Sequence, residues 1–138
     1  MNDPTALTSS GLSPIALATL PVEVQQRIAA AWAHGRALIL NANKPGYSEA
    51  FSIEAEQYVL LRDCILNAVE SLTRDSGEAL LKDVVAISQS TLGRNARFPK
   101  GRMTNYTRYV KTDLEARGEI ERVPQSSPQR IRRVLSAS

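Results

Sequence analysis

The sequence predicts a mainly α-helical domain with a small β-hairpin, an α+β fold, and three observations support this prediction. Apolar residues recur at helical spacing in four segments of the chain: 19–35, 52–72, 79–92 and 102–117. The last segment is followed by a glycine and by two short alternating segments around a polar turn. A chain of 138 residues suits one domain and is long enough to bury a hydrophobic core.

The N-terminal part divides into two pieces. Residues 1–18 are rich in Ser, Thr, Pro and small residues without periodicity, which predicts a flexible arm. An amphipathic helix is predicted over 19–35, because Val24, Ile28 and Trp32 recur at helical spacing. Two roles stay open for this helix: it pairs with its copy in a homodimer, or it docks on its own domain.

Residues 36–138 are predicted to form the main domain. It begins with short strands at 37–40 and 47–53, which the turn-forming sequence NANKPG at 41–46 separates. Ser52 is expected to cap the next helix, since acidic residues follow it in the first helical turn. A second, shorter helix is predicted over about 79–92, and a loop with glycine, proline and several basic residues follows it.

The helix predicted over 102–117 has two different faces. Met103, Tyr106, Val110 and Leu114 form an apolar stripe at spacings of three and four residues, so this stripe is expected to face the core. The opposite face is polar and is expected to be exposed. It carries Thr104, Asn105, Arg108 and Thr112, with Lys111 beside them and Glu115 at its end.

A β-hairpin is predicted after Gly118, which ends the helix. Its strands are 119–123 and 129–134, and PQSSP forms the turn between them. Alternation places Ile120 and Ile131 inward and Arg130 and Arg132 outward.

Charge is distributed unevenly along the chain. Residues 91–138 carry eleven basic and four acidic groups, a balance of +7, whereas residues 54–90 carry three basic and seven acidic groups, a balance of −4. Such asymmetry indicates a polyanionic partner near the C-terminal part. Ion pairing between the acidic and basic segments is the alternative interpretation.

The sequence is not expected to encode an enzyme or a membrane protein. No metal-ligand spacing, P-loop, GxSxG or GxGxxG motif occurs, so neither a metal nor a cofactor is expected. No apolar run of 18 residues and no signal peptide is evident. Cys64 is the one cysteine and is predicted to be a small core residue; a reducing, cytoplasmic location is expected.

The stretch YVKTDLEARGEIERV at 109–123 resembles the passage from recognition helix to wing in winged helix-turn-helix regulators. Together with KPGY at 44–47, YVLLRDCIL at 58–66 and the remainder of the hairpin to 134, it also resembles a small family of uncharacterised prokaryotic winged-helix-like proteins. The resemblance implies a winged-helix domain in which 102–117 is the recognition helix and 119–134 is the wing. The narrower family brings a fold and no activity.

This resemblance implies a protein that binds double-stranded DNA, a transcriptional regulator in the simplest case. Asn105 and Arg108 suit bidentate contacts to adenine and guanine, and the other residues suit contacts to phosphates or to thymine methyl groups. The expected DNA-binding residues are Arg97, Lys100, Arg102, Thr104, Asn105, Arg108, Lys111, Thr112, Arg130, Arg132 and Arg133.

Two features leave an alternative open. The connection between the helices at 79–92 and 102–117 has about ten residues, whereas a helix-turn-helix usually has three or four. Glu115, Glu119 and Glu121 are also expected close to the proposed DNA-binding face, where they would repel phosphates. The alternative is a winged-helix module for protein interaction or dimerisation that binds no nucleic acid.

Overall fold

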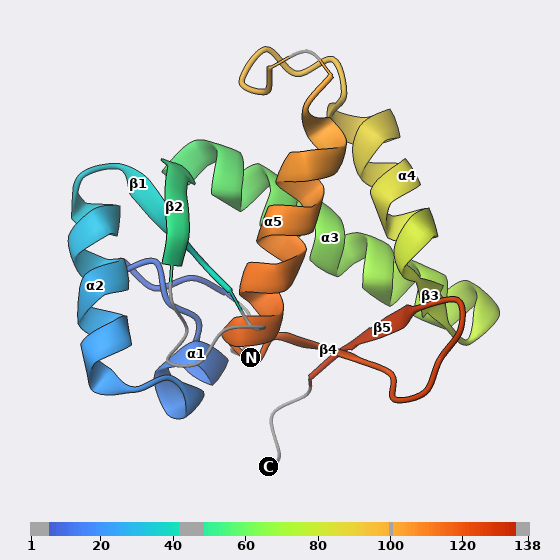
Figure 1. The fold of residues 1–138 in the computed structure, drawn as a ribbon, viewed down its shortest axis with the longest axis horizontal. Helices are drawn as coiled ribbons and strands as arrows, with labels where there is room; N and C mark the ends of the chain where they lie inside the picture. Colours follow the sequence, from blue (N-terminus) through green and yellow to red (C-terminus); the bar gives the residue numbers. More distant parts are fainter. Residues whose placement is uncertain (1–5, 42–48, 100, 135–138) are drawn as a thin grey trace.

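The computed structural model describes residues 6–41, 49–99 and 101–134 of the chain (Figure 1). It has a mixed α+β fold in which helices predominate. The elements follow in the order α1 (Pro14–Thr19), α2 (Val22–Ala33), β1 (Arg36–Leu40), β2 (Glu49–Glu54), α3 (Ala55–Ser76), β3 (Ala79–Leu80), α4 (Leu81–Leu92), α5 (Met103–Ala116), β4 (Ile120–Arg122) and β5 (Arg130–Arg133).

The long helix α3 runs behind α5 through the centre of the molecule (Figure 1). It begins with a capping box in which the Glu54 side chain and the Gln57 side chain each bond the other residue's backbone N–H. It ends at Gly77, whose φ of +84° is a conformation that glycine adopts without steric strain. Ser52 was the predicted cap, but that prediction is wrong, because Ser52 pairs with Leu38 inside the β1–β2 hairpin.

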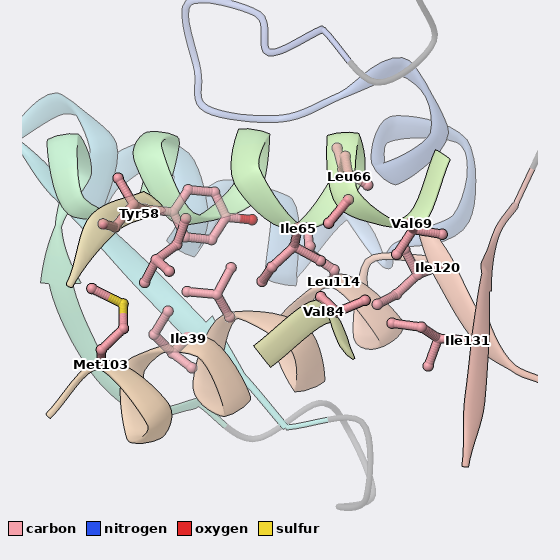
Figure 2. Packing of buried hydrophobic residues seen from close by; sticks show 14 of the residues in the cluster. Ile39, Tyr58, Ile65, Leu66, Val69, Val84, Met103, Leu114, Ile120 and Ile131 are labelled. Atoms are coloured by element: carbon pink, nitrogen blue, oxygen red, sulfur yellow. The ribbon is translucent and has the colours of Figure 1, made fainter. Parts of the chain in front are cut away.

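The main core lies between α3, α4, α5 and the C-terminal sheet (Figure 2). Tyr58, Leu61 and Ile65 of α3 have no exposed surface, and their spacing of three and four residues places them on one face. Val84 of α4 and Leu114 of α5 pack against this face and are equally buried. Met103, Val110 and Leu114 of the stripe predicted for α5 are therefore confirmed as core, whereas Tyr106 is half-buried and packs against the core.

The C-terminal sheet has three antiparallel strands in the order β3-β5-β4. The hairpin of β4 and β5 was predicted, and Ile120 and Ile131 point inward as expected, each 1% exposed. β3 was not predicted, because Ala79–Leu80 was assigned to the start of the following helix. A strand of two residues has no periodicity, and it exists here because Ala79 pairs with Ile131.

The N-terminal part forms a second apolar cluster with the end of α5. Leu12, Ala16, Leu20, Val24, Ile28, Leu40 and Ala116 are its buried members. The prediction of a flexible arm therefore fails for the described part of that segment, where Ser13 caps α1 by accepting a hydrogen bond from the Ala16 N–H. α1 has only six residues, so its stability comes from packing and not from helix propensity.

The predicted amphipathic helix is α2, and it packs on its own chain. Val24 is 5% exposed and Ile28 has no exposed surface, so the apolar stripe that was considered for a homodimer is already covered. After α2, β1 and β2 form an antiparallel hairpin that lies beside α5 (Figure 1). The predicted turn at 41–46 lies mostly outside the described residues. Among the described helices, none has the length and apolar content needed to span a membrane.

Candidate nucleic-acid interface

One narrow strip of α5 remains open to solvent. Asn105 and Arg108 are exposed, Thr112 is half-buried, and their spacing of three and four residues aligns them along the helix. The Arg108 side chain has no ion pair with any residue in the described part of the chain. This strip is the central part of the predicted polar face of α5.

The edge of the predicted polar face differs from expectation. Lys111 was predicted beside the exposed residues, but its side chain is 5% exposed and pairs with Glu115. Glu115 is itself 9% exposed and also pairs with Arg122 at 3.3 Å, so it does not lie on an open face. Thr104 accepts a hydrogen bond from the Gln89 side chain of α4. Contacts with Gln89 of α4 and Arg122 of β4 therefore make the exposed polar face of α5 narrower than predicted.

The long connection between α4 and α5 folds away from the open strip. The Gln57 amide at the start of α3 donates to the Arg97 carbonyl oxygen, and Phe98 is buried with its ring 5.7 Å from that of Tyr106. Figure 1 shows the described part of this connection beyond the N-terminal end of α5, and Asn105 and Arg108 are exposed. The unusual length of this connection therefore does not bury Asn105 or Arg108.

The basic residues of this connection have different surroundings. Arg97 pairs with Glu56 of α3. Arg94 and Arg102 are exposed, and neither has an ion pair with a described residue. Lys100, another predicted contact, lies outside the described residues. Arg94, which follows α4, and Arg102, which directly precedes α5, thus join Arg108 as exposed cations in this part of the chain.

The arginines of the predicted wing are all engaged with acidic side chains. Arg132 donates a 2.6 Å hydrogen bond to Glu121 on the neighbouring strand, and Arg133 donates one of 2.6 Å to Glu70 of α3. Arg130 lies 2.6 Å from Glu78, a contact that has the distance of an ion pair but not the geometry of a hydrogen bond at Nε. The alternative interpretation of the charge asymmetry, pairing within the chain, applies to this hairpin.

Aromatic rings line the other edge of the strip. The Tyr109 ring lies 4.7 Å from Phe51 of β2 and 6.2 Å from Tyr106, in edge-to-face arrangements in both cases. Tyr109 is 39% exposed, whereas Tyr106 and Phe51 are half-buried. The β1–β2 hairpin thereby fixes a partly exposed aromatic ring next to Asn105 and Arg108.

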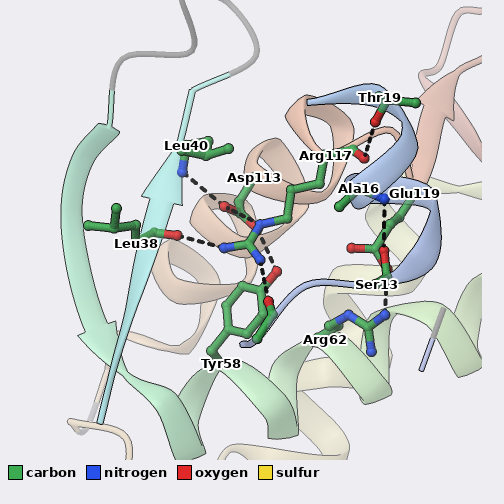
Figure 3. Close-up of polar contacts among 11 residues, drawn as sticks. Ser13, Ala16, Thr19, Leu38, Leu40, Tyr58, Arg62, Asp113, Arg117 and Glu119 are labelled. Carbon is green, nitrogen blue, oxygen red and sulfur yellow. Dashed lines mark hydrogen bonds and ion pairs between the residues drawn. The ribbon is translucent and has the colours of Figure 1, made fainter. Parts of the chain in front are cut away.

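Sequence reasoning missed a buried ionic network at the opposite end of α5 (Figure 3). Arg117 and Asp113 form an ion pair with no exposed surface, and the Arg117 guanidinium lies 4.7 Å from the centre of the Tyr58 ring. Asp113 accepts hydrogen bonds from the Leu40 backbone N–H at 2.9 Å and from the Tyr58 hydroxyl at 2.7 Å. Arg117 donates to the carbonyl oxygens of Gly11 and of Leu38.

A second buried pair continues this network. Arg62 of α3 donates a short hydrogen bond to Glu119, which has no exposed surface, so Glu119 does not flank the wing as predicted. Burial raises the pKa of the Glu119 carboxyl, and the charge of Arg62 partly opposes this shift. Burial also raises the pKa of the Tyr58 phenol, which stays protonated and can donate to Asp113. The network joins elements, but it is closed to solvent and offers no accessible reactive group.

A comparison with protein families identifies where this chain belongs. A family model described as a family of unknown function, DUF6958, matches residues 36–131. The chain is a member of the DUF6958 family. Among curated proteins and among solved structures, no significant match was found.

The DUF6958 match begins at the first residue of β1 and ends within β5. It thus includes the β1–β2 hairpin, the strip on α5, and the charged residues Asp113, Arg117 and Glu119. α1 and α2 lie before the matched residues, although Gly11 and the apolar residues of this N-terminal part contact the family region directly. The resemblance to an uncharacterised family is confirmed at this level, and the family description carries no activity.

Proposed function

We propose that residues 55–134 form a winged-helix unit that binds double-stranded DNA, with α5 in the major groove. The order α3–β3–α4–α5–β4–β5 supports this proposal, because helix α4, the connection and α5 correspond to a helix-turn-helix followed by a hairpin. The pairing of β3 with the hairpin gives further support, since it holds the wing against the helices.

The observation that carries the proposal is the open strip of α5. Asn105 and Arg108 are exposed polar residues whose side chains can read base edges, Asn at adenine and Arg at guanine. The major groove is about 12 Å wide and admits one α-helix. The strip is narrow, but the described part of the preceding connection leaves it open on the helix surface.

Phosphate contacts would come from the N-terminal end of α5. Arg102 directly precedes α5, Arg108 lies within it and Arg94 follows α4; all three are exposed cations that have no acidic partner among the described residues. The first turn of α5 contains no acidic residue, and no side chain caps it, so its backbone N–H groups add positive potential. The wing would contribute less than expected, because a phosphate must compete with Glu78, Glu121 or Glu70 for each of its arginines.

A salt titration tests the proposal. Fluorescence anisotropy with a random-sequence duplex of about 20 base pairs should give a slope of log K against log salt of about −3, since three arginines that have no acidic partner among the described residues would each neutralise one phosphate. Arg108→Ala should reduce this slope by about one. Arg74→Ala is the matched control, because Arg74 is an exposed arginine at the far end of α3. Binding weaker than about 100 μM at low salt contradicts the proposal.

The second candidate is a protein-interaction module, and the pairing of all three wing arginines favours it. A winged helix that does not bind DNA needs no free cations on its hairpin. A protein that co-purifies in stoichiometric amount, without nucleic acid, supports this candidate. Binding of duplex DNA that depends on Arg108 excludes it as the sole function.

A further inference from the structure

Tyr109 is the only aromatic side chain that is exposed among the residues described, with 39% of its surface open. It lies four residues after Asn105 and three residues before Thr112, so it borders the open strip of α5. The other described aromatic residues are buried or half-buried. An aromatic ring is therefore present where the proposed function places the surface of DNA.

The Tyr109 ring is held in a fixed orientation. Phe51 of β2 meets it edge-on at 4.7 Å with an interplanar angle of 79°, and Tyr106 meets it at 6.2 Å with an angle of 70°. A ring that is already fixed loses little conformational freedom when it contacts a ligand, so the contact is more favourable than one from a mobile side chain. The β1–β2 hairpin, which precedes the proposed winged-helix unit, provides this support.

The chemistry of the major groove selects the contact that such a ring would make. Thymine is the base that presents an apolar group in this groove, its C5 methyl, and aromatic and aliphatic side chains recognise it. Four residues of α-helix rise about 6 Å, which is close to two base-pair steps of about 3.4 Å. A helix that places Asn105 at one base would therefore place Tyr109 about two steps away.

We propose that Tyr109 is a specificity-determining residue that contacts the C5 methyl of a thymine, and that Phe51 is a positioning residue for its ring. This inference rests on the proposed function, because it requires α5 to lie in the major groove. It adds an aromatic contact to thymine beyond any contact that the methyl group of Thr112 could make in the same strip.

The experiment removes one methyl group from the DNA. A duplex is first selected with the wild-type protein from a random 20-base-pair library, and each of its thymines is then replaced by deoxyuridine, one at a time. We expect one position at which this replacement weakens binding about fourfold, the effect of one buried methyl-sized group. Tyr109→Ala should bind the thymine and deoxyuridine forms equally. Arg108→Ala should weaken binding to both forms and retain their ratio.

Phe51→Leu tests the positioning role. It removes the edge-to-face support while keeping an apolar side chain, and it should reduce the thymine-to-deoxyuridine ratio toward one. If Phe51 has only a structural role, its replacement should lower thermal stability without changing the thymine-to-deoxyuridine ratio. Circular dichroism establishes that each variant is folded before its ratio is interpreted.

The possible failures are distinguishable. If the wild-type protein binds no duplex, the proposed function fails and this inference fails with it. If it binds duplex DNA in a salt-dependent way but no deoxyuridine position matters, the inference alone is overturned. It is also overturned if folded Tyr109→Ala keeps the fourfold preference, because another residue then contacts the methyl group.

Discussion

The Arg117 guanidinium lies 3.0 Å from the Asp113 carboxylate one helical turn earlier, and neither side chain has any exposed surface. Arg117 also donates hydrogen bonds to the carbonyl oxygens of Gly11 and Leu38, while Asp113 accepts a hydrogen bond from the Leu40 N–H. One ion pair thus connects the N-terminal segment, the β1–β2 hairpin and the end of α5. Such a pair specifies where these elements meet, whatever its net contribution to stability.

Replacement of Arg117 should strongly destabilise the protein. Arg117→Met keeps much of the side-chain volume but leaves the buried Asp113 carboxylate without its counter-charge, which typically costs about 3–5 kcal/mol. Urea denaturation measures the loss in unfolding free energy. Arg108→Ala, an exposed arginine on the same helix, is the control and should change stability by at most about 0.5 kcal/mol. A loss below about 1 kcal/mol for Arg117→Met would show that the pair contributes little to holding the elements together.

Periodicity predicted the parts of the fold that depend on local patterns. The core stripe of α5 and the inward Ile120 and Ile131 follow from spacing alone, because apolar residues at such positions have to be covered. Periodicity did not predict the burial of residues whose environment depends on a partner that is distant in the sequence. Glu119 was expected near the DNA-binding face and no role was predicted for Arg117, because nothing local reveals that Arg62 and Asp113 neutralise these residues inside the core.

The candidate interface was predicted in outline and corrected in detail. Asn105 and Arg108 are exposed as expected, because they lie opposite the core stripe. Lys111 is buried because Glu115 and the nearby β4 strand cover that edge, which a helical wheel cannot show. The Tyr109 ring packs against Phe51, which comes from a strand 58 positions earlier in the sequence, and a helical wheel cannot show such a contact.

The stability contribution of Glu119 should fall as the pH rises. Burial raises the pKa of this carboxyl in the folded state, so above the ordinary carboxyl value the folded protein binds more protons than the unfolded chain. The unfolding free energy of the wild-type protein should therefore decline relative to that of Glu119→Gln as the pH rises from about 4 to about 6. Chemical denaturation at several pH values measures this difference.

Glu121→Gln is the matched control for this pH series, since Glu121 is 48% exposed on the adjacent strand. This variant removes one exposed carboxyl group from the same region and leaves the buried Glu119 in place. The opposite trend for Glu119→Gln, a wild-type protein that gains stability over the variant as the pH rises, would mean that Arg62 outweighs burial and lowers the pKa of this carboxyl.

Gly11 should tolerate no side chain, whereas Gly35 should tolerate one better. Both have positive φ, +74° and +75°. A Cβ at Gly11 would overlap the Trp32 indole, while at Gly35 no atom lies within 4 Å. Gly35→Ala should lose about 1–2 kcal/mol from its backbone conformation alone, and Gly11→Ala should lose about 1–3 kcal/mol more from overpacking. If urea denaturation gives the same loss of unfolding free energy for both variants, residues 6–13 can shift away from Trp32 at no energetic cost.

Trp32→Glu should destabilise the folded chain without changing its oligomeric state. The Trp32 ring meets Tyr58 edge-on at 6.3 Å, and its helix α2 packs on its own domain through Val24 and Ile28. We expect a loss of roughly 1–3 kcal/mol, since the ring is half-buried. Light scattering should give the same mass for the variant and the wild-type protein. Val22→Glu is the control for the outer surface, because Val22 is 65% exposed. A dimer that Trp32→Glu converts to a monomer would contradict this packing.

The wing arginines should matter more for stability than for DNA binding. Arg130, Arg132 and Arg133 each lie 2.6 Å from an acidic residue, Glu78, Glu121 and Glu70 respectively. Partly exposed pairs of this kind contribute about 0.2–1 kcal/mol each, so their joint replacement by Ala should lower the melting temperature by about 2–8 °C. Salt-dependent DNA affinity should fall only slightly, because these cations are already neutralised.

The charge-matched comparison replaces Arg94, Arg102 and Arg108 by Ala together. These three exposed arginines have no acidic partner among the described residues, so their removal should leave the melting temperature nearly unchanged. It should abolish most of the salt dependence of DNA binding, since each contact contributes about −0.9 to the slope. The reverse pattern, DNA binding lost with the wing variant and retained with this one, would place the interface on the hairpin and away from α5.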